Sequence, residues 1–181
     1  MIEAYSVNSA GKQSPSITCS LRKVNSEWKI TLLSKYNPQY NAGGDEGLID
    51  GVRGAENFRL GGWQGYQGCD FEAIIDLGKP QNIKKISAGF LQDVRSWIWM
   101  PQYVEFFTSS DGSDYTSFGR VDNLIDIKDY EPTVQDLSKE AEAHNVRYVR
   151  IFAKNYGKLP DWHLGAGGDA YIFTDEISIN N

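Results

Sequence analysis

The sequence has few of the side chains on which most catalytic sites depend. Only two histidines, His144 and His163, occur among its 181 residues, and no HExxH, GxSxG or P-loop motif is present. GAGGDA (165–170) contains a Gly-x-Gly, but it leads into a predicted strand rather than a helix, which is the wrong context for a dinucleotide. Asp175 and Glu176 are adjacent on that strand, so we expect them to point to opposite faces and not to form a glycosidase pair. We therefore expect that this chain by itself is not an enzyme.

Basic clusters, long apolar runs and cysteines are also scarce. The formal net charge is −6 and no Lys/Arg cluster is longer than a pair such as Lys84-Lys85, so nucleic acid is an unsuitable partner. No run of 18 apolar residues occurs, and we expect no membrane-spanning segment. The N-terminus lacks the features of a signal peptide, which indicates a cytoplasmic protein or a piece of a longer secreted chain. Cys19 and Cys69 could form one disulfide or stay as two thiols, so the compartment remains open.

Aromatic residues and glycine, in contrast, are abundant. Aromatic side chains make up 13% of the sequence and there are 18 glycines, a combination typical of β-sheet proteins with many turns. Helical periodicity is almost absent: 44–50 is expected to form one turn, and 138–145 a surface turn. The expected strands span residues 27–33, 71–78, 84–91, 102–112, 146–154 and 170–179. Short strands joined by turns, without intervening helices, predict an all-β antiparallel sandwich.

The N-terminal part contains two further predicted strands, 2–7 and 16–23, around the turn-forming segment NSAGKQSP. Two strands alone are only marginally stable in water, so this hairpin must dock on the main domain or on a neighbouring domain. We divide the chain into a hairpin (1–24), a linker with the first strand (25–34) and the sandwich (35–181).

The stretch DVRSWIWMP (93–101) places two tryptophans one residue apart. If the following strand is extended backwards with period two, Ile98 and Met100 lie on the face of the aliphatic core. Trp97 and Trp99 then lie on the opposite face, nearer to solvent. We expect one of these two rings to pack beneath the loop, and the sequence does not indicate which one.

Several motifs occur in the order of a known family. LIDG, GWQG, FEAIIDLG, YVEFFTSSDG and VRYVRIFA follow one another between residues 48 and 153, and Glu176 lies on the last predicted strand. This order resembles the discoidin, or coagulation-factor C-type, domain, an eight-stranded jelly roll also known as the family-32 carbohydrate-binding module. The resemblance covers roughly residues 35–181. The usual Asp-Gly-Asn-x-x-Thr-x-Trp is stretched here to DGVRGAENFRLGGW.

A narrower resemblance concerns the parent protein. GWQGYQG, SWIWMP and PDWHLGAGGDAYIFTDEI are similar to the C-terminal module of Bacteroidetes-type family-20 glycoside hydrolases, the β-N-acetylhexosaminidases or chitobiases. Residues 1–24 resemble the last hairpin of the β-domain that precedes this module. The resemblance implies a non-catalytic module in a periplasmic or extracellular enzyme, with a glycan and the catalytic domain of the same polypeptide as partners. The alternative is an accessory domain that packs on the catalytic domain and binds no sugar.

The resemblance also implies the positions of two sites. Loops at one end of this fold carry the ligand, and a sugar stacks its C–H face on an aromatic ring while polar groups orient its hydroxyls. The residues expected there are Arg95, Trp97, Trp99, Trp162 and His163. Many members also hold a structural Ca²⁺, for which the matching carboxylates are those of Asp50 and Glu176. Asp50 could instead only cap a turn before Gly51. Trp63 matches the buried tryptophan of the family.

Overall fold

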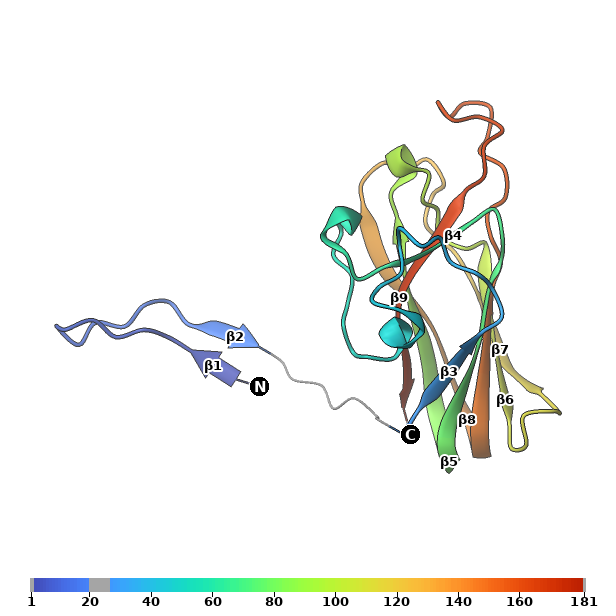
Figure 1. Cartoon of the computed structure of the whole chain (residues 1–181), viewed down its shortest axis with the longest axis horizontal. Helices are drawn as coiled ribbons and strands as arrows, with labels where there is room; N and C mark the ends of the chain where they lie inside the picture. Colours follow the sequence, from blue (N-terminus) through green and yellow to red (C-terminus); the bar gives the residue numbers. More distant parts are fainter. Residues whose placement is uncertain (1, 20–26, 181) are drawn as a thin grey trace.

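A computed structural model of the chain describes residues 2–19 and 27–180 and confirms the all-β class. Two strands belong to the N-terminal part, and seven strands and three short 3₁₀ helices to the sandwich (Figure 1). These elements are β1 (Ile2–Ala4), β2 (Ile17–Cys19), β3 (Lys29–Leu32), η1 (Asp45–Leu48), η2 (Phe58–Leu60), β4 (Gln64–Gln67), β5 (Phe71–Gln92), η3 (Val94–Ser96), β6 (Tyr103–Ser109), β7 (Thr116–Asp122), β8 (Thr133–Ala153) and β9 (Tyr171–Asn180). In the described part, no helix is long and apolar enough to cross a membrane.

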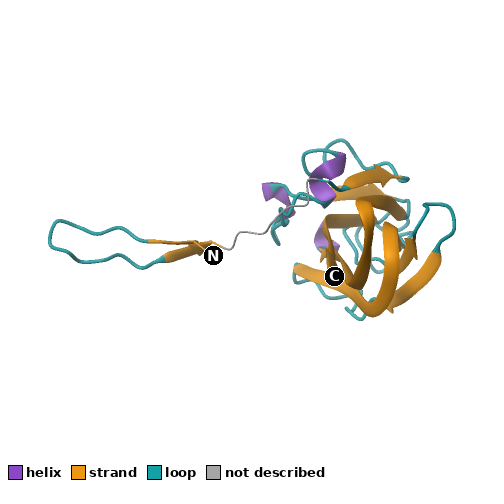
Figure 2. Cartoon of the chain, turned by 90° about the horizontal axis from the view of Figure 1, so that it is seen from below, coloured by secondary structure: helices purple, strands orange, loops and turns teal. Residues whose placement is uncertain are grey.

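Two long strands, β5 and β8, build both layers of the sandwich. They pair antiparallel along their whole length, and the sheet order is β4-β9-β5-β8-β6-β7, with β3 on the first half of β5. The first half of β5 therefore lies in one layer with β3, β6 and β7, and its second half lies in the other layer with β9 and β4. Figure 2 shows how the strands curve around a common interior.

The bend of the sheet coincides with turn-forming residues. The β5–β8 register shifts between Asp76 and Lys85, where Gly78 has a positive φ of 78°. Asp76 Oδ1 accepts the Gly78 N–H at 2.9 Å, and Asn145 on β8 has a φ of 57°. The Asp-Leu-Gly sequence thus forms a turn inside one bent strand, whereas two separate strands were expected at 71–78 and 84–91.

The main core fills the space between the layers. Phe71, Ala73, Ile75 and Leu77 are all buried, as the period-two pattern of this segment predicts. A second, smaller apolar cluster lies on the outer side of the β9 layer and includes Trp63. Trp63 is 2% exposed, which confirms its predicted place in the core.

The prediction of a surface turn at 138–145 was wrong, because these residues are part of β8. Between residues 133 and 145 only Leu137 is buried, so this half of β8 has no apolar alternation that could identify it as a strand. β7 was missed for the same reason, because only Phe118 is buried in it. β4 is mostly buried, but its sequence QGYQ has only one apolar side chain, that of Tyr66, and so gives no alternation. At 44–50, the expected helical turn is present as η1.

The N-terminal strands β1 and β2 pair with each other, from Ile2↔Cys19 to Ala4↔Ile17, and form a separate two-stranded sheet. All described side chains from Glu3 to Thr18 are exposed, including Ile17 at 77%. The parts of the predicted strand 16–23 and linker 25–34 that fall on residues 20–26 lie outside the described residues. Cys69 is a free, exposed thiol.

Candidate functional site

The loop of residues 93–99 is not an extended strand. Asp93 and Ile98 exchange two backbone hydrogen bonds of 3.0 and 3.2 Å, which closes a tight loop around the single turn of η3. At the end of η3, Trp97 adopts the left-handed conformation with a φ of 67°. This conformation is uncommon for a bulky residue, and it breaks the period-two alternation that the sequence suggested.

The two neighbouring tryptophans are consequently placed in opposite environments. Trp97 is 38% exposed and Trp99 is 1% exposed. The Trp99 indole is stacked on Tyr156 with ring centroids 5.4 Å apart, and its Nε1 donates to the Ile127 carbonyl at 3.1 Å. The expectation that Trp99 shares the solvent-facing side with Trp97 was therefore wrong, and Trp99 is the ring that packs beneath the loop.

The exposed ring of Trp97 rests on bare backbone. A Cβ atom added to Gly165 would lie 2.5 Å from the indole Cε2, and one added to Gly168 would lie 3.1 Å from Cζ3. Only glycine therefore allows the 165–168 backbone to approach the ring this closely. Because this contact covers part of the ring, the exposed remainder of Trp97 is the part that a ligand could reach.

His163 fixes the second loop to the first. Its side chain is 6% exposed, and its Nε2 lies 2.9 Å from the Val94 carbonyl oxygen. The Gly165 N–H donates to Nδ1 at 3.0 Å, so Nδ1 is the acceptor and the Nε2–H donates to Val94. With both nitrogens engaged, His163 positions the loops instead of facing outward to sugar hydroxyls as expected.

Further half-exposed rings continue this surface. Trp162 and Tyr130 are each 38% exposed, with ring centroids 6.4 Å apart. The Arg95 guanidinium lies over Tyr130 at 5.6 Å, and Lys128 Nζ lies over Trp162 at 5.4 Å. We name Trp97, Tyr130 and Trp162, with these two cations, the aromatic platform. The sequence reasoning missed Tyr130 and Lys128, for which an aromatic residue in the polar loop IKDYEP was the only available signal.

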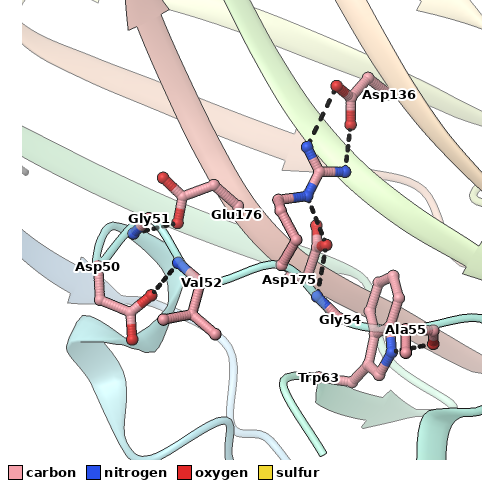
Figure 3. Close-up of polar contacts among 10 residues, drawn as sticks. Asp50, Gly51, Val52, Gly54, Ala55, Trp63, Asp136, Asp175 and Glu176 are labelled. Carbon is pink, nitrogen blue, oxygen red and sulfur yellow. Dashed lines mark hydrogen bonds and ion pairs between the residues drawn. The ribbon is translucent and has the colours of Figure 1, made fainter. Parts of the chain in front are cut away.

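A second irregular segment, residues 50–63, covers the outer side of β9, and we name it the strap (Figure 3). Asp50 Oδ1 accepts the Val52 N–H at 2.7 Å, which forms an Asx turn. The Gly51 N–H donates to Glu176 Oε2 at 3.0 Å, and Glu176 is only 3% exposed. Trp63 Nε1 donates to the Ala55 carbonyl at 2.9 Å and holds the other end of the strap.

Arg53 attaches the middle of the strap to the sheet. Its Nε donates to Asp175 Oδ2 at 2.7 Å, its Nη2 donates to Asp136 Oδ1 at 2.6 Å, and the Gly54 N–H adds a bond of 3.0 Å to Asp175. Burial raises the pKa of Asp175, whose side chain is fully buried, although Arg53 opposes this shift. A Cβ on Gly89 would lie 2.1 Å from Asp175 Oδ1, so glycine leaves the space for this ion cluster.

A β-bulge explains why both neighbouring carboxylates meet the strap. Ala88 pairs with Ile177 and Phe90 with Thr174, which leaves Asp175 and Glu176 opposite the single residue Gly89. Such an extra residue disturbs the regular alternation of side chains. The expectation that Asp175 and Glu176 point to opposite faces was therefore wrong, and Figure 3 shows both carboxylates at the strap.

No protein-family model and no curated protein matches the chain. Solved structures do match, and one is CpGH89CBM32-5 from Clostridium perfringens in complex with GalNAc-β-1,3-galactose, at 18% identity, a TM-score of 0.53 and coverage of 87% of this chain and 98% of that one. The CBM32-1 of a family 31 glycoside hydrolase from the same organism has 17% identity, a TM-score of 0.54 and coverage of 88% and 98%. Chitosan-binding module 1 from a chitosanase/glucanase of Paenibacillus sp. IK-5 has 11% identity, a TM-score of 0.54 and coverage of 89% and 100%.

The chain has the discoidin-like fold of family-32 carbohydrate-binding modules. The resemblance that the sequence motifs indicated is thus confirmed at the level of the fold. Within this discoidin-like domain, hydrogen bonds from His163 to Val94 and from Trp99 to Ile127 join the three loops of the platform. The three loops that carry the platform are therefore held together by hydrogen bonds beneath their exposed rings.

The carboxylates that the family resemblance assigns to Ca²⁺ come from the strap, which carries Asp50, and from β9, which carries Glu176. Asp50 and Glu176 each accept a backbone N–H of the same turn, which orients both carboxylates around Gly51. Within the described residues, no group of three or more His, Cys, Asp or Glu side chains converges on a point. Two carboxylates fit the acidic part of a Ca²⁺ shell, and backbone carbonyls of the strap would have to complete its six to eight oxygens.

Proposed function

We propose that this discoidin-like domain is a non-catalytic carbohydrate-binding module whose ligand stacks on Trp97. The observation that carries the proposal is the placement of this ring, which rests on the bare 165–168 backbone and is 38% exposed. A ring held in this way offers a flat apolar surface without a conformational cost on binding, which suits the C–H face of a pyranose. Arg95 and Lys128 lie beside the other rings of the platform and offer donors to sugar hydroxyls.

The proposed ligands are glycans with galactose or N-acetylhexosamine residues. The module CpGH89CBM32-5, which has the same fold, was solved with GalNAc-β-1,3-galactose, and this supports the ligand class. One or two stacked rings bury little area, so we expect a millimolar Kd, or roughly −4 to −5 kcal/mol. Tight binding in a cell would then depend on several modules or on a multivalent glycan.

The proposed parent protein is a secreted glycoside hydrolase of the β-N-acetylhexosaminidase, or chitobiase, type. The motifs around Trp63, Trp97 and Trp162 support this assignment, and several structures with this fold are modules of glycoside hydrolases. The module would hold the catalytic domain of the same polypeptide on its glycan, in the periplasm or outside the cell. The competing proposal is an accessory domain that packs on the catalytic domain without binding sugar.

A glycan-array screen followed by titration of Trp97→Ala tests the proposal. The variant is expected to lose measurable binding, because a stacked ring contributes about 1–2 kcal/mol to an already weak affinity. Its unfolding midpoint is expected to stay close to that of the parent, since Trp97 lies at the surface. Tyr5→Ala is the matched control, because it removes an exposed ring from the N-terminal hairpin.

Two results would contradict the proposal. If no glycan binds the intact chain, or if Trp97→Ala binds as the parent does, the platform is not a sugar site. The accessory-domain alternative would then be favoured, and binding of the chain to an isolated catalytic domain would be the measurement that supports it.

A further inference from the structure

A hollow on the surface of the domain lies apart from the aromatic platform. Its volume is about 610 Å³, and it opens between segment 39–43 and the end of the strap at 58–63. No residue of the platform lines it. Cavities of this size accommodate small ligands such as a single sugar ring, so the hollow has room for a ligand of its own.

Both walls of the hollow are fixed by the core. Tyr40, on one wall, packs against Phe58 of the other wall with ring centroids 6.0 Å apart, and against Phe173 of β9 at 4.8 Å. Asn41 Oδ1 accepts the Gly43 N–H at 2.9 Å, and this bond shapes the rim. The hollow is therefore preformed, and a ligand would not have to order its walls.

The rim exposes backbone rather than side chains. Gly43 and Gly61 have positive φ values of 85° and 93°, and no atom lies within 4 Å of the position that a Cβ would occupy at either residue. The N–H groups of both residues are engaged, because Gly43 donates to Asn41 Oδ1 and Gly61 donates to the Phe58 carbonyl oxygen at 3.1 Å. The two glycines can therefore offer only their carbonyl oxygens to a ligand in the hollow. A carbonyl oxygen accepts a hydrogen bond from a sugar hydroxyl.

Among the described residues that line the hollow, Arg59 has the single charged side chain. Its guanidinium lies 4.6 Å from the centre of the Phe58 ring, and in the described part of the chain it has no carboxylate partner. In contrast, Arg53 on the same strap is bound by Asp136 and Asp175. Arg59 is thus exposed, oriented by an aromatic ring and free to bind an anionic group. The amide of Gln39 also lies in the lining, whereas the amide of Asn41 is bonded to the Pro38 carbonyl oxygen and to the Gly43 N–H.

We propose that this hollow is a second binding site, which takes an acidic saccharide unit, that is, a pyranose ring with a carboxylate. The planar guanidinium of Arg59 pairs with the carboxylate through two parallel hydrogen bonds. The amide of Gln39 and the carbonyl oxygens of Gly43 and Gly61 bind the hydroxyls. The site is independent of Trp97, so it adds a second contact to a glycan without relying on the platform.

Amide chemical shifts of the whole ¹⁵N-labelled chain test the site, with sodium glucuronate, glucose and sodium acetate as probes. Glucuronate and glucose share a ring and differ in the carboxylate, and acetate has the carboxylate without the ring. Glucuronate is expected to shift the amides of Gly43, Gly61 and Gly62 in a saturable way, with roughly tenfold weaker binding of the other two probes, as for one charge-assisted pair. Arg59→Gln is expected to remove this preference, and Arg95→Gln, the matched arginine of the platform, to keep it.

Each other outcome overturns the inference. Equal binding of glucose and glucuronate, or an unchanged preference in Arg59→Gln, would exclude an acidic ligand. Shifts confined to Trp97, or no saturable shift at the three glycines, would exclude the hollow as a site. Neither result affects the proposed function, because sugar binding at the platform is read from the Trp97 indole signal and from Trp97→Ala. Conversely, loss of the Trp97 indole signal change alone would not affect the conclusion about binding in the hollow.

Discussion

The strap and the aromatic platform both consist of irregular segments that carry tryptophan, yet the strap buries its tryptophan and the platform exposes its two. Trp63 of the strap is 2% exposed, whereas Trp97 of the platform is 38% exposed. The strap directs its charged Arg53 to the sheet, and the platform is held from below by the buried His163. The difference indicates that the strap uses its charged side chain to attach itself to the sheet, while the platform leaves part of each ring exposed to solvent.

The largest expected effect separates the two tryptophans of one loop. Trp99→Ala removes a buried ring and its bond to Ile127, and we expect it to lower the free energy of unfolding by about 3–5 kcal/mol. Trp97→Ala is expected to cost about 1 kcal/mol or less, since the ring is partly exposed. Urea titration measures both. Equal losses would mean that the platform is a packing element and would remove the contrast with the strap.

The next effect concerns the strap. Asp175→Ala leaves Arg53 and the Gly54 N–H without their acceptor at the sheet, and we expect a loss of about 2–3 kcal/mol in unfolding free energy. This figure is at the low end for a broken buried pair, because the Arg53 side chain is 40% exposed and keeps Asp136. The same urea titration provides the measurement.

Two control variants define the cause of that loss. Asp175→Asn keeps an acceptor oxygen for Gly54 and is expected to lose less than Asp175→Ala. Gly89→Ala keeps every charge but brings a methyl group to 2.1 Å from Asp175 Oδ1, so it should also destabilise the strap. Sugar binding at the platform should survive in all three variants at temperatures where they stay folded. A selective loss of sugar binding would show that strap and platform are coupled.

Calcium is expected to act on the strap alone. If Ca²⁺ binds at Asp50 and Glu176, it stabilises the folded chain by RT ln(1 + [Ca²⁺]/Kd), or about 1.4 kcal/mol at ten times Kd. Thermal melts with EDTA and with millimolar Ca²⁺ measure this difference. Asp50→Ala should abolish it, and Trp97→Ala should leave it unchanged. Identical melting curves of the parent chain in the two solutions would mean that Ca²⁺ does not bind at Asp50 and Glu176.

The sandwich could be predicted where one face of a strand is buried and the other is not. Phe71, Ala73, Ile75 and Leu77 are an example, because their alternation follows directly from the two faces of the sheet. The first half of β8 could not be predicted, since only Leu137 is buried there. That half is held by backbone pairing with β5, and pairing between distant segments leaves no periodic signal in the sequence.

The platform could be predicted by residue type but not by geometry. Arg95, Trp97 and Trp162 were predicted to lie on loops, and the structure places all three on loops at exposed positions. Trp99 was misplaced because one left-handed residue, Trp97, reverses the alternation. His163 was misplaced because its two hydrogen-bond partners are backbone groups, and backbone groups leave no signal in the residue types of a sequence. That Arg95, Trp97 and Trp162 bind a sugar stays a prediction.

The structure of the strap could not be predicted, because it depends on contacts between residues far apart in the chain. Arg53 and Asp175 are 122 residues apart in the chain, and the bulge that brings Asp175 and Glu176 to one side depends on the register of β5 with β9. The family resemblance did point to Asp50 and Glu176, and they do meet at one turn. It gave no indication of the Arg53 cluster beside them.

The smallest expected effect comes from an ion pair of the same chemistry in a more open setting. Arg147 donates from Nε and Nη2 to the two carboxylate oxygens of Asp76, each at 3.0 Å, on the outer face of the sheet. Asp76→Asn should therefore destabilise the chain much less than Asp175→Ala, because water and salt screen an exposed pair. An equal loss would mean that burial does not distinguish the strap from an ordinary surface pair.

The pH dependence of the Asp76 pair provides a further check on this comparison. The hydrogen bonds from Arg147 lower the pKa of Asp76 below that of an ordinary aspartate. A carboxylate with a lowered pKa contributes its full stability above its unfolded pKa, near pH 4, and loses it as the pH falls through the folded value. The difference in unfolding free energy between the parent and Asp76→Asn should thus shrink below about pH 4.

Burial raises the pKa of Asp175 instead, so its proton binds more tightly in the folded chain than in the unfolded chain. The contribution of Asp175 protonation to the unfolding free energy should therefore fall as the pH rises, which is the opposite trend to that of Asp76. Urea titrations of both variants between pH 3 and pH 7 would measure the two trends, and parallel trends would contradict the separation of a buried strap from an exposed ion pair.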